Sequence, residues 1–217
     1  MKSMENIRGQ AEILSVVLLF GILIIVLIVG FTWGKGIYDS QQVRLTADKM
    51  ASKLFEVKSA ILAVTHEGLN SSRIVNVDVP VGELRITNGG FCSNKAMSGN
   101  SISFNVTTAE KLISSEDWIS IDPSESNTSC DASYENSSAA VLMGKAEKAG
   151  NNFVNSYTLW FRNLTQANGA SNNFYVINIS PGDTSAASGG SHRIIVRNNG
   201  TLNSSFTVYT SIKVDII

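Results

Sequence analysis

The fold of this chain is decided by residues 13–31, which read ILSVVLLFGILIIVLIVGF. No charged side chain interrupts the stretch, and Ser15 is the only polar one between Ile13 and Val29. At a rise of 1.5 Å per residue, about 19 helical residues come close to the roughly 30 Å of a bilayer's hydrocarbon core. The stretch therefore predicts a membrane-length helix, and the rest of the 217-residue chain is organised around it.

Three interpretations of this helix compete. A removable secretory signal is expected to have a shorter apolar region, with small residues at a cleavage site behind it. Here the stretch ends in Phe31-Thr32-Trp33-Gly34-Lys35, where bulky rings stand in place of small residues. A removable signal is therefore disfavoured. A plain single-pass anchor agrees with the apolar stretch taken alone, and the third interpretation depends on the residues before it.

The residues directly before the stretch are Arg8-Gly9-Gln10-Ala11-Glu12. With Lys2 and Arg8 as positive charges, they resemble the class III signal peptide of type IV pilin-like proteins in its archaeal form. In that family a prepilin peptidase cuts after the leader's final Gly, and the apolar segment stays in the mature protein. The resemblance implies a leader over residues 1–9, a cut between Gly9 and Gln10, and a pilus assembly platform as a further partner.

Glu12 separates the plain anchor from the pilin-like interpretation. A carboxylate beside an apolar run is costly, and ionisable groups at such places are functional candidates. In a plain anchor Glu12 lies at headgroup level. In the pilin family an early Glu neutralises the new α-amino group of a neighbouring subunit during assembly. The resemblance assigns this assembly role to Glu12, which stands at the third mature position, whereas bacterial pilins have it at the fifth.

Beyond the apolar run the helix is expected to continue with a different character. Apolar residues recur at alternating spacings of four and three, which is an amphipathic seam of heptad type. Its members are Val43, Ala47, Met50, Leu54, Val57, Ile61 and Val64. We expect one helix from about Ala11 to Thr65, with a Gly stop near Gly68 and Asn70 and soft points at Gly30, Gly34 and Gly36. The seam is expected to pack on the chain's own domain, with packing on neighbouring subunits as the alternative.

From Ser72 onward the apolar period changes to two. Residues 73–81 and 84–87 alternate and are expected to form a hairpin. Further strands are predicted at residues 101–107, 118–121, 155–161, 174–179, 192–197 and 205–214. Turns are predicted at Asn168-Gly169, Pro181-Gly182-Asp183, Gly189-Gly190 and Asn198-Asn199-Gly200. Residues 138–148 fit a helix or a strand. The predicted fold class is α+β: a long hydrophobic helix over 10–67 (13–31 in the membrane or filament core, 38–65 amphipathic), then an antiparallel, sandwich-like β domain over 70–217.

The two cysteines, Cys92 and Cys130, are predicted to form a disulfide if the domain is exported. The bridge would close a loop of about 39 residues and contribute about 3–4 kcal/mol through chain entropy. Two free buried thiols are the alternative, which the polar surroundings of both residues disfavour.

N-glycosylation sequons of the form N-x-Ser/Thr occur throughout the β domain and are absent from the helix. Several are expected by chance in a chain rich in Asn, Ser and Thr. They begin at Asn70, Asn105, Asn127, Asn136, Asn163, Asn178, Asn199 and Asn203. We expect occupancy first at the loop sites Asn70, Asn127, Asn136 and Asn199.

Composition and motifs point away from catalysis and from nucleic acid. Charged residues make up 16% of the chain, the net charge is -1, and no basic block is present. Gly-rich phosphate loops, G-x-S-x-G, H-E-x-x-H and C-x-x-C are absent, and His66 and His192 are isolated in sequence. Asp residues lie among turn residues, where Asp is locally favoured. We therefore predict no enzyme activity, no cofactor and no metal site.

Together these patterns predict a structural subunit of an archaeal type IV pilus-like surface filament that serves adhesion. The precursor is expected in the cell membrane with its N-terminus inside the cell. Lys2 and Arg8 favour this orientation slightly, because positive charges flanking a membrane helix tend to stay on the inner side. The mature chain is expected to form an extracellular helical homo-oligomer. The alternatives are a minor pilin, a membrane-anchored surface glycoprotein that never polymerises, and, as a narrower variant, an archaellin.

Overall fold

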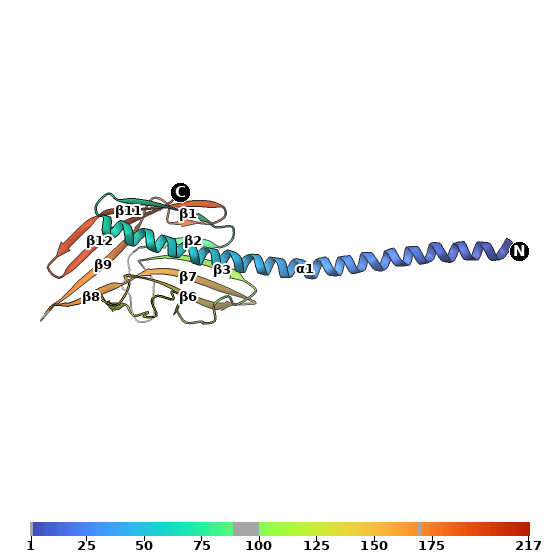
Figure 1. Cartoon of the computed structure of the whole chain (residues 1–217), viewed down its shortest axis with the longest axis horizontal. Helices are drawn as coiled ribbons and strands as arrows, with labels where there is room; N and C mark the ends of the chain where they lie inside the picture. Colours follow the sequence, from blue (N-terminus) through green and yellow to red (C-terminus); the bar gives the residue numbers. More distant parts are fainter. Residues whose placement is uncertain (1, 89–99, 169–170) are drawn as a thin grey trace. The chain divides into compact units, whose positions relative to one another are not determined.

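A computed structural model describes residues 2–88, 100–168 and 171–217, with side chains described except at residues 2–14, 131, 168 and 171. The chain divides into two compact units, residues 1–42 and 43–217. The helix α1 (Lys2–Glu67) supplies all of the first unit that is described and the beginning of the second (Figure 1). It begins nine residues before the predicted start at Ala11, and it continues without interruption through Gly30, Gly34 and Gly36.

The helix ends where the sequence predicts. Its last residue is Glu67, and Gly68 follows with a φ of 91°, a conformation that glycine adopts without steric cost. The next turn is closed by Ser71, whose hydroxyl donates to the main-chain carbonyls of Val64 at 2.9 Å and Gly68 at 2.7 Å. The polar contacts of this turn occupy carbonyl groups that the end of a helix leaves without partners.

The β domain has two six-stranded sheets, which we name sheet A and sheet B. Sheet A has the order β1-β11-β12-β9-β8-β5. Its strands are β1 (Ser72–Asp78), β11 (Ser191–Ser204), β12 (Thr207–Ile216), β9 (Ser171–Pro181), β8 (Asn163–Asn168) and β5 (Asp131–Ser133). Sheet B has the order β10-β2-β3-β7-β6-β4. Its strands are β10 (Ala186–Ala187), β2 (Glu83–Thr87), β3 (Ser101–Thr108), β7 (Asn152–Phe161), β6 (Ala140–Ala149) and β4 (Ile119–Ser120).

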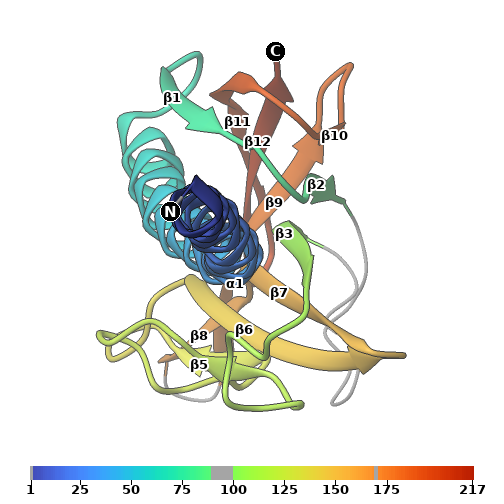
Figure 2. The ribbon, with the colours of Figure 1, turned by 90° about the vertical axis from the view of Figure 1, so that its right-hand side faces the viewer.

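The amphipathic half of α1 lies in one hydrophobic core with both sheets. In Figure 2, β1, β11 and β12 lie on one side of the helix and β6 and β7 on the other. Apart from half-buried Val43, every seam residue is at most 1% exposed, namely Ala47, Met50, Leu54, Val57, Ile61 and Val64. Burial of a Val, Leu, Ile or Met side chain contributes about 1.5–3 kcal/mol. The predicted packing of the seam on the chain's own domain is confirmed, as is the α+β fold class.

The pairing of the strands departs from the expected antiparallel arrangement in sheet A. Sheet B is antiparallel throughout the described residues, whereas β12–β9 and β5–β8 are parallel pairs. Strand β12 lies between β11, its hairpin partner, and β9, from which the chain returns through β10 and β11. Parallel pairing here follows from connections of many residues, which a local pattern does not reveal.

The predicted hairpin of residues 73–81 and 84–87 is wrong. Strand β1 pairs with β11 in sheet A, and β2 pairs with β10 and β3 in sheet B. Between them Pro80 has no N–H for a ladder, and Gly82 turns the chain with a φ of 91°. A Cβ at Gly82 would lie 2.5 Å from the carbonyl oxygen of Asn105, so this crossing between sheets requires glycine.

Two further local patterns are resolved by the structure. Residues 138–148, which fitted a helix or a strand, contribute β6. The expected turn at Asn198-Asn199-Gly200 lies instead inside β11, where the register with β12 shifts between Asn198 and Gly200. It is a β-bulge, in which Gly200 has a φ of 117°, and the hairpin turn follows at residues 205–206.

Candidate functional site

The exposed apolar surface of α1 is the first candidate site. Across Val16–Phe31 the large apolar side chains are all exposed, from 50% at Leu23 to 74% at Phe31. A helix that is apolar all round is typical of burial in a membrane or in protein. By length and composition α1 can cross a membrane. This segment therefore needs a covering medium that the described part of the chain does not provide.

The polar groups at the end of this surface satisfy one another. Thr32 donates its hydroxyl to the carbonyls of Ile28 and Val29, each at 3.0 Å. A hydroxyl bonded within its own helix costs less to remove from water than a free one. The apolar surface therefore extends past Phe31 without an unsatisfied hydroxyl.

The residues predicted for processing and assembly lie at the start of α1. Arg8, Gly9, Gln10 and Glu12 are helical, and their side chains lie outside the described ones. The peptidase site and the assembly role of Glu12 therefore stay predictions.

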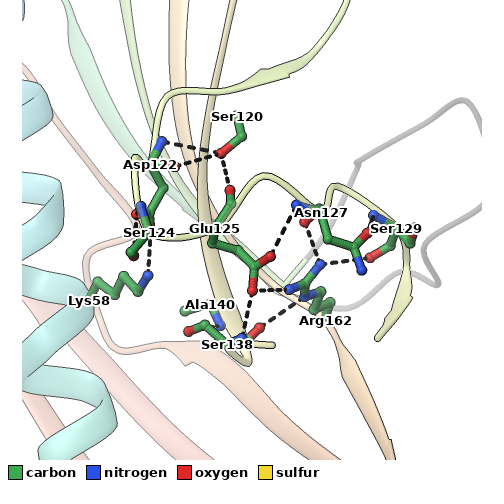
Figure 3. A network of polar contacts seen from close by, with 10 residues as sticks. All are labelled: Lys58, Ser120, Asp122, Ser124, Glu125, Asn127, Ser129, Ser138, Ala140 and Arg162. Atoms are coloured by element: carbon green, nitrogen blue, oxygen red, sulfur yellow. Dashed lines mark hydrogen bonds and ion pairs between the residues drawn. The ribbon is translucent and has the colours of Figure 1, made fainter. Parts of the chain in front are cut away.

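The second candidate site is a polar network that anchors residues 121–139 to the core of the β domain (Figure 3). Lys58 of α1 forms an ion pair with Asp122 at 2.5 Å, with side-chain exposures of only 11% and 2%. Asp122 also accepts hydrogen bonds from the main chain of Ser124 at 2.9 Å and from its hydroxyl at 2.6 Å. Burial alone would raise the pKa of Asp122, but Lys58 and Ser124 outweigh it and hold the pKa below 3.8.

Arg162, directly after β7, forms the other half of the network (Figure 3). Its guanidinium forms an ion pair with the Glu125 carboxylate at 2.7 Å, and both side chains are buried. It also donates to three main-chain carbonyls: Ser138 at 2.9 Å, Asn127 at 2.6 Å and Ser129 at 3.3 Å. Burial lowers the pKa of Arg162, and the charge of Glu125 opposes that shift.

Arg162 thus fixes the segment around Cys130, because its carbonyl partners include Ser129. Cys130 is disulfide-bonded. The other cysteine of the sequence, Cys92, lies outside the described residues, so the Cys92–Cys130 pair itself stays a prediction. The sequence did not predict the roles of Arg162, Glu125 and Lys58. The one signal for Arg162 was its place directly after an apolar run, at the end of the strand that closes with Leu159-Trp160-Phe161.

The sequons differ in accessibility. Asn105 in β3 and Asn163 in β8 are half-buried, whereas the other six asparagines are exposed: Asn70, Asn127, Asn136, Asn178, Asn199 and Asn203. Of the four expected loop sites, Asn199 lies in strand β11 instead. The six exposed asparagines are the more accessible ones for glycan attachment in the folded domain, and all eight sequons stay predictions.

A cavity of about 390 Å³ lies between the last turns of α1 and sheet A. Its lining includes the apolar side chains of Leu62, Leu164 and Ile177 and the ring of Tyr134, which packs on Tyr175 with ring centres 4.4 Å apart. His66 also lines it, while His192 lies on β11. Within the described residues no cluster of three or more His, Cys, Asp or Glu side chains is placed to hold a metal ion.

Comparison with protein-family models, with curated proteins and with solved structures found no match to this chain.

Proposed function

We propose that this chain is the structural subunit of a type IV pilus-like surface filament of the archaeal kind, which attaches cells to surfaces. Its leader, residues 1–9, is removed by a prepilin peptidase between Gly9 and Gln10. The mature chain then assembles through α1 into a helical homo-oligomer outside the cell, with the β domain on the filament surface.

The observation that carries the proposal is that every large apolar side chain from Val16 to Phe31 is exposed. In the precursor, lipid covers this surface. In the filament, the same surface on neighbouring copies covers it, so extraction from the bilayer does not expose it to water. A helix that stays apolar on every side suits both environments, because neither offers hydrogen bonds to polar side chains.

The two parts of α1 have different surroundings, and this difference supports the same proposal. The seam from Ala47 to Val64 is buried by the chain's own sheets, so it is not available to neighbours. The apolar segment before Lys35 is left for contacts between copies. Glu12 at the start of that segment pairs with the α-amino group of Gln10 in an adjacent subunit, which neutralises two charges within the apolar filament core.

The experiment that tests the proposal is N-terminal sequencing of the protein recovered from cells, followed by electron microscopy of the surface fraction. The proposal expects a start at Gln10 and filaments composed of this chain. A start at Met1 without filaments would contradict it and would favour a membrane-anchored surface glycoprotein. A start beyond Phe31 would contradict both, because the apolar helix would then be absent from the mature protein. A start at Gln10 with the chain as a trace component of filaments would identify a minor pilin.

A further inference from the structure

A row of apolar side chains crosses the outer face of sheet A. Leu202 of β11 pairs with Tyr209 of β12, and Tyr209 pairs in turn with Val176 of β9. We call these three residues the outer row. Leu202 is 74% exposed and Tyr209 is 44% exposed, whereas Val176 is half-buried, so water meets apolar surface on β11 and β12. The three strands lie side by side in Figure 1.

The burial of neighbouring residues establishes that the outer row faces away from the core. Along β9, Ile177 and Ile179 are buried, whereas Asn178 between them is exposed. Along β12, Thr210 is buried, whereas Tyr209 before it is exposed. Side chains alternate between the faces of a strand, so the outer row and Asn178 share the outer face.

The next row along the same face contains Gly200, Ser211 and Asn178. Ser211, directly beside Asn178, has a small side chain, whereas the position of Gly200 is approached by Leu69, whose Cδ1 would lie 3.4 Å from a Cβ there. Asn178 begins the sequon Asn178-Ile179-Ser180, and its amide forms no hydrogen bond with the described part of the chain. Tyr209 is its diagonal neighbour on the same face of the parallel pair β12–β9, since Ser211, the partner of Asn178, lies two residues after Tyr209.

We infer that Asn178 carries an N-linked glycan whose first sugars pass beside Ser211 and cover the outer row, with a sugar face against the ring of Tyr209. A neutral sugar suits the place, because the C–H groups of its ring pack on an aromatic or aliphatic surface while its hydroxyls stay in water. The inference rests on the proposed export of the β domain and adds to it the attachment site and the task of the glycan.

The attachment needs a donor on the outer side of the membrane, of the class of polyprenyl phosphate- or diphosphate-linked oligosaccharides. The Asn178 amide nitrogen forms a bond to the anomeric carbon of the first sugar and loses one proton. The bond between that carbon and the phosphate oxygen breaks, and the lipid-linked phosphate leaves with the electron pair. The side chain stays an amide, and no electron is transferred to or from another molecule.

The position of Asn178 distinguishes it from the other sequons. Asn203 directly follows Leu202 on β11 and pairs with Val208, which directly precedes Tyr209, so strand alternation places Asn203 on the opposite face from the outer row. Asn127 and Asn136 lie outside the strands, in the segment 121–139 that connects β4 with β6 in the sequence. Asn178 lies on a regular strand, in the row next to the outer row. A glycan attached there is close enough to cover exposed apolar side chains.

The test combines glycopeptide mass spectrometry with hydroxyl-radical labelling of the full-length protein purified from its own cells. We expect Asn178 to be occupied. Loss of the glycan in Asn178→Gln should raise radical labelling of Tyr209 by about twofold or more, because one face of an aromatic ring becomes open. Tyr134 is the internal reference, since its exposure in the protein chain is also 44%. Its labelling should not change in Asn178→Gln.

Two further variants make the test specific. Ser180→Ala removes the same sequon but keeps Asn178, and it should have the same effect on Tyr209. Asn136→Gln removes a sequon two residues from Tyr134 and should leave Tyr209 unchanged. An unmodified Asn178 would overturn the inference, and so would an occupied Asn178 whose removal leaves Tyr209 labelling unchanged. The N-terminus of the same sample separates the two proposals: a start at Gln10 leaves the filament proposal standing, whereas a start at Met1 without any glycan overturns both.

Discussion

The side-chain amide of Asn198 donates a hydrogen bond of 3.0 Å to the main-chain carbonyl of Val64, across 134 residues of sequence. Asn198 is completely buried, and its amide oxygen accepts from the N–H of Gly200 at 2.8 Å. Its main chain also bonds with Asn70 and Ser71 in the turn after α1. The bulge of β11 thus caps the end of the helix and joins α1 to sheet A.

Replacement of Asn198 by Ala should destabilise the β domain. The variant removes one donor to the Val64 carbonyl, which keeps the Ser71 hydroxyl, and it leaves the N–H of Gly200 without its Asn198 acceptor, at a cost of about 1–3 kcal/mol. Urea unfolding of the full-length protein in detergent, followed by near-UV circular dichroism, measures the change. Asn76→Ala on exposed β1 is the control and should stay within about 0.5 kcal/mol of the wild type. Equal stability of the two variants would show that the cap is unimportant.

Arg162→Met alone should lower the stability of the β domain more than removal of both charges of the Arg162–Glu125 ion pair. The single variant leaves the buried Glu125 carboxylate without its cation, at a cost of about 3–5 kcal/mol. The double variant Arg162→Met with Glu125→Gln removes both charges and should recover part of that loss. Denaturant unfolding of both variants provides the comparison, and a double variant less stable than the single one would contradict the argument.

The Lys58–Asp122 pair should make stability depend on acid pH. The pKa of Asp122 in the folded domain lies below 3.8, so its contribution is present above that value and is lost as pH falls through the folded pKa. Lys58→Met removes the hydrogen bond and the charge of Lys58, so burial is opposed only by the two hydrogen bonds of Ser124 and the pKa of Asp122 is lowered less than in the wild type. The variant's loss of stability relative to the wild type should therefore grow as pH rises from the folded pKa of Asp122 toward its ordinary value of about 4.

The control for this pH profile is Lys53→Met. Lys53 pairs with Glu56 on the exposed side of the same helix, with side-chain exposures of 41% and 52%. An exposed pair contributes about 0–1 kcal/mol, so this variant should follow the wild-type profile. If stability varied with pH in the same way in Lys58→Met and Lys53→Met, the pKa of Asp122 would not depend on Lys58, and the prediction would be wrong.

Tyr157 should make the domain sensitive to alkali. Burial and the negative charge of Asp48 raise its pKa from 10.0 to about 12. Between these values the unfolded chain loses a proton that the folded domain keeps, so stability falls as pH rises, by on the order of 2–3 kcal/mol. Tyr157→Phe should remove this fall, as measured by thermal unfolding at pH values from 9 to about 12. Tyr38→Phe on the exposed part of α1 should leave the fall in place.

Gly9→Leu and Glu12→Ala should interrupt filament formation at different steps. A bulky side chain at the proposed cut should leave full-length precursor in the membrane. Removal of the Glu12 carboxylate should permit the cut but impair assembly, because the new α-amino group has no anion to neutralise it. Immunoblots of precursor and mature chain, with electron microscopy, distinguish the steps. Normal filaments from either variant would contradict its assigned role.

The polar network could not be predicted from local sequence pattern, because its members are identified by contacts with residues far away in the sequence. Lys58 is one of several lysines on the amphipathic helix, and its sequence neighbours do not distinguish it from Lys49 or Lys53. Its role follows from Asp122, which lies 64 residues later and accepts its hydrogen bond. In the same way Asn198-Asn199-Gly200 has the composition of a turn, yet its contact with Val64 makes it a bulge.

The sequence by itself determined the elements whose pattern repeats within a few residues. The charge-free run 13–31, the seam from Val43 to Val64 and the stop at Gly68 were predicted because a helix forms bonds between residues four apart. The alternation of period two likewise predicted most of the strands. Tertiary structure alone decided that β1 and β2 belong to different sheets, that β12 is parallel to β9, and that Arg162 binds Glu125. These outcomes depend on the free energy of contacts between distant segments, where a strand pairs with the partner that buries its apolar face and satisfies its backbone.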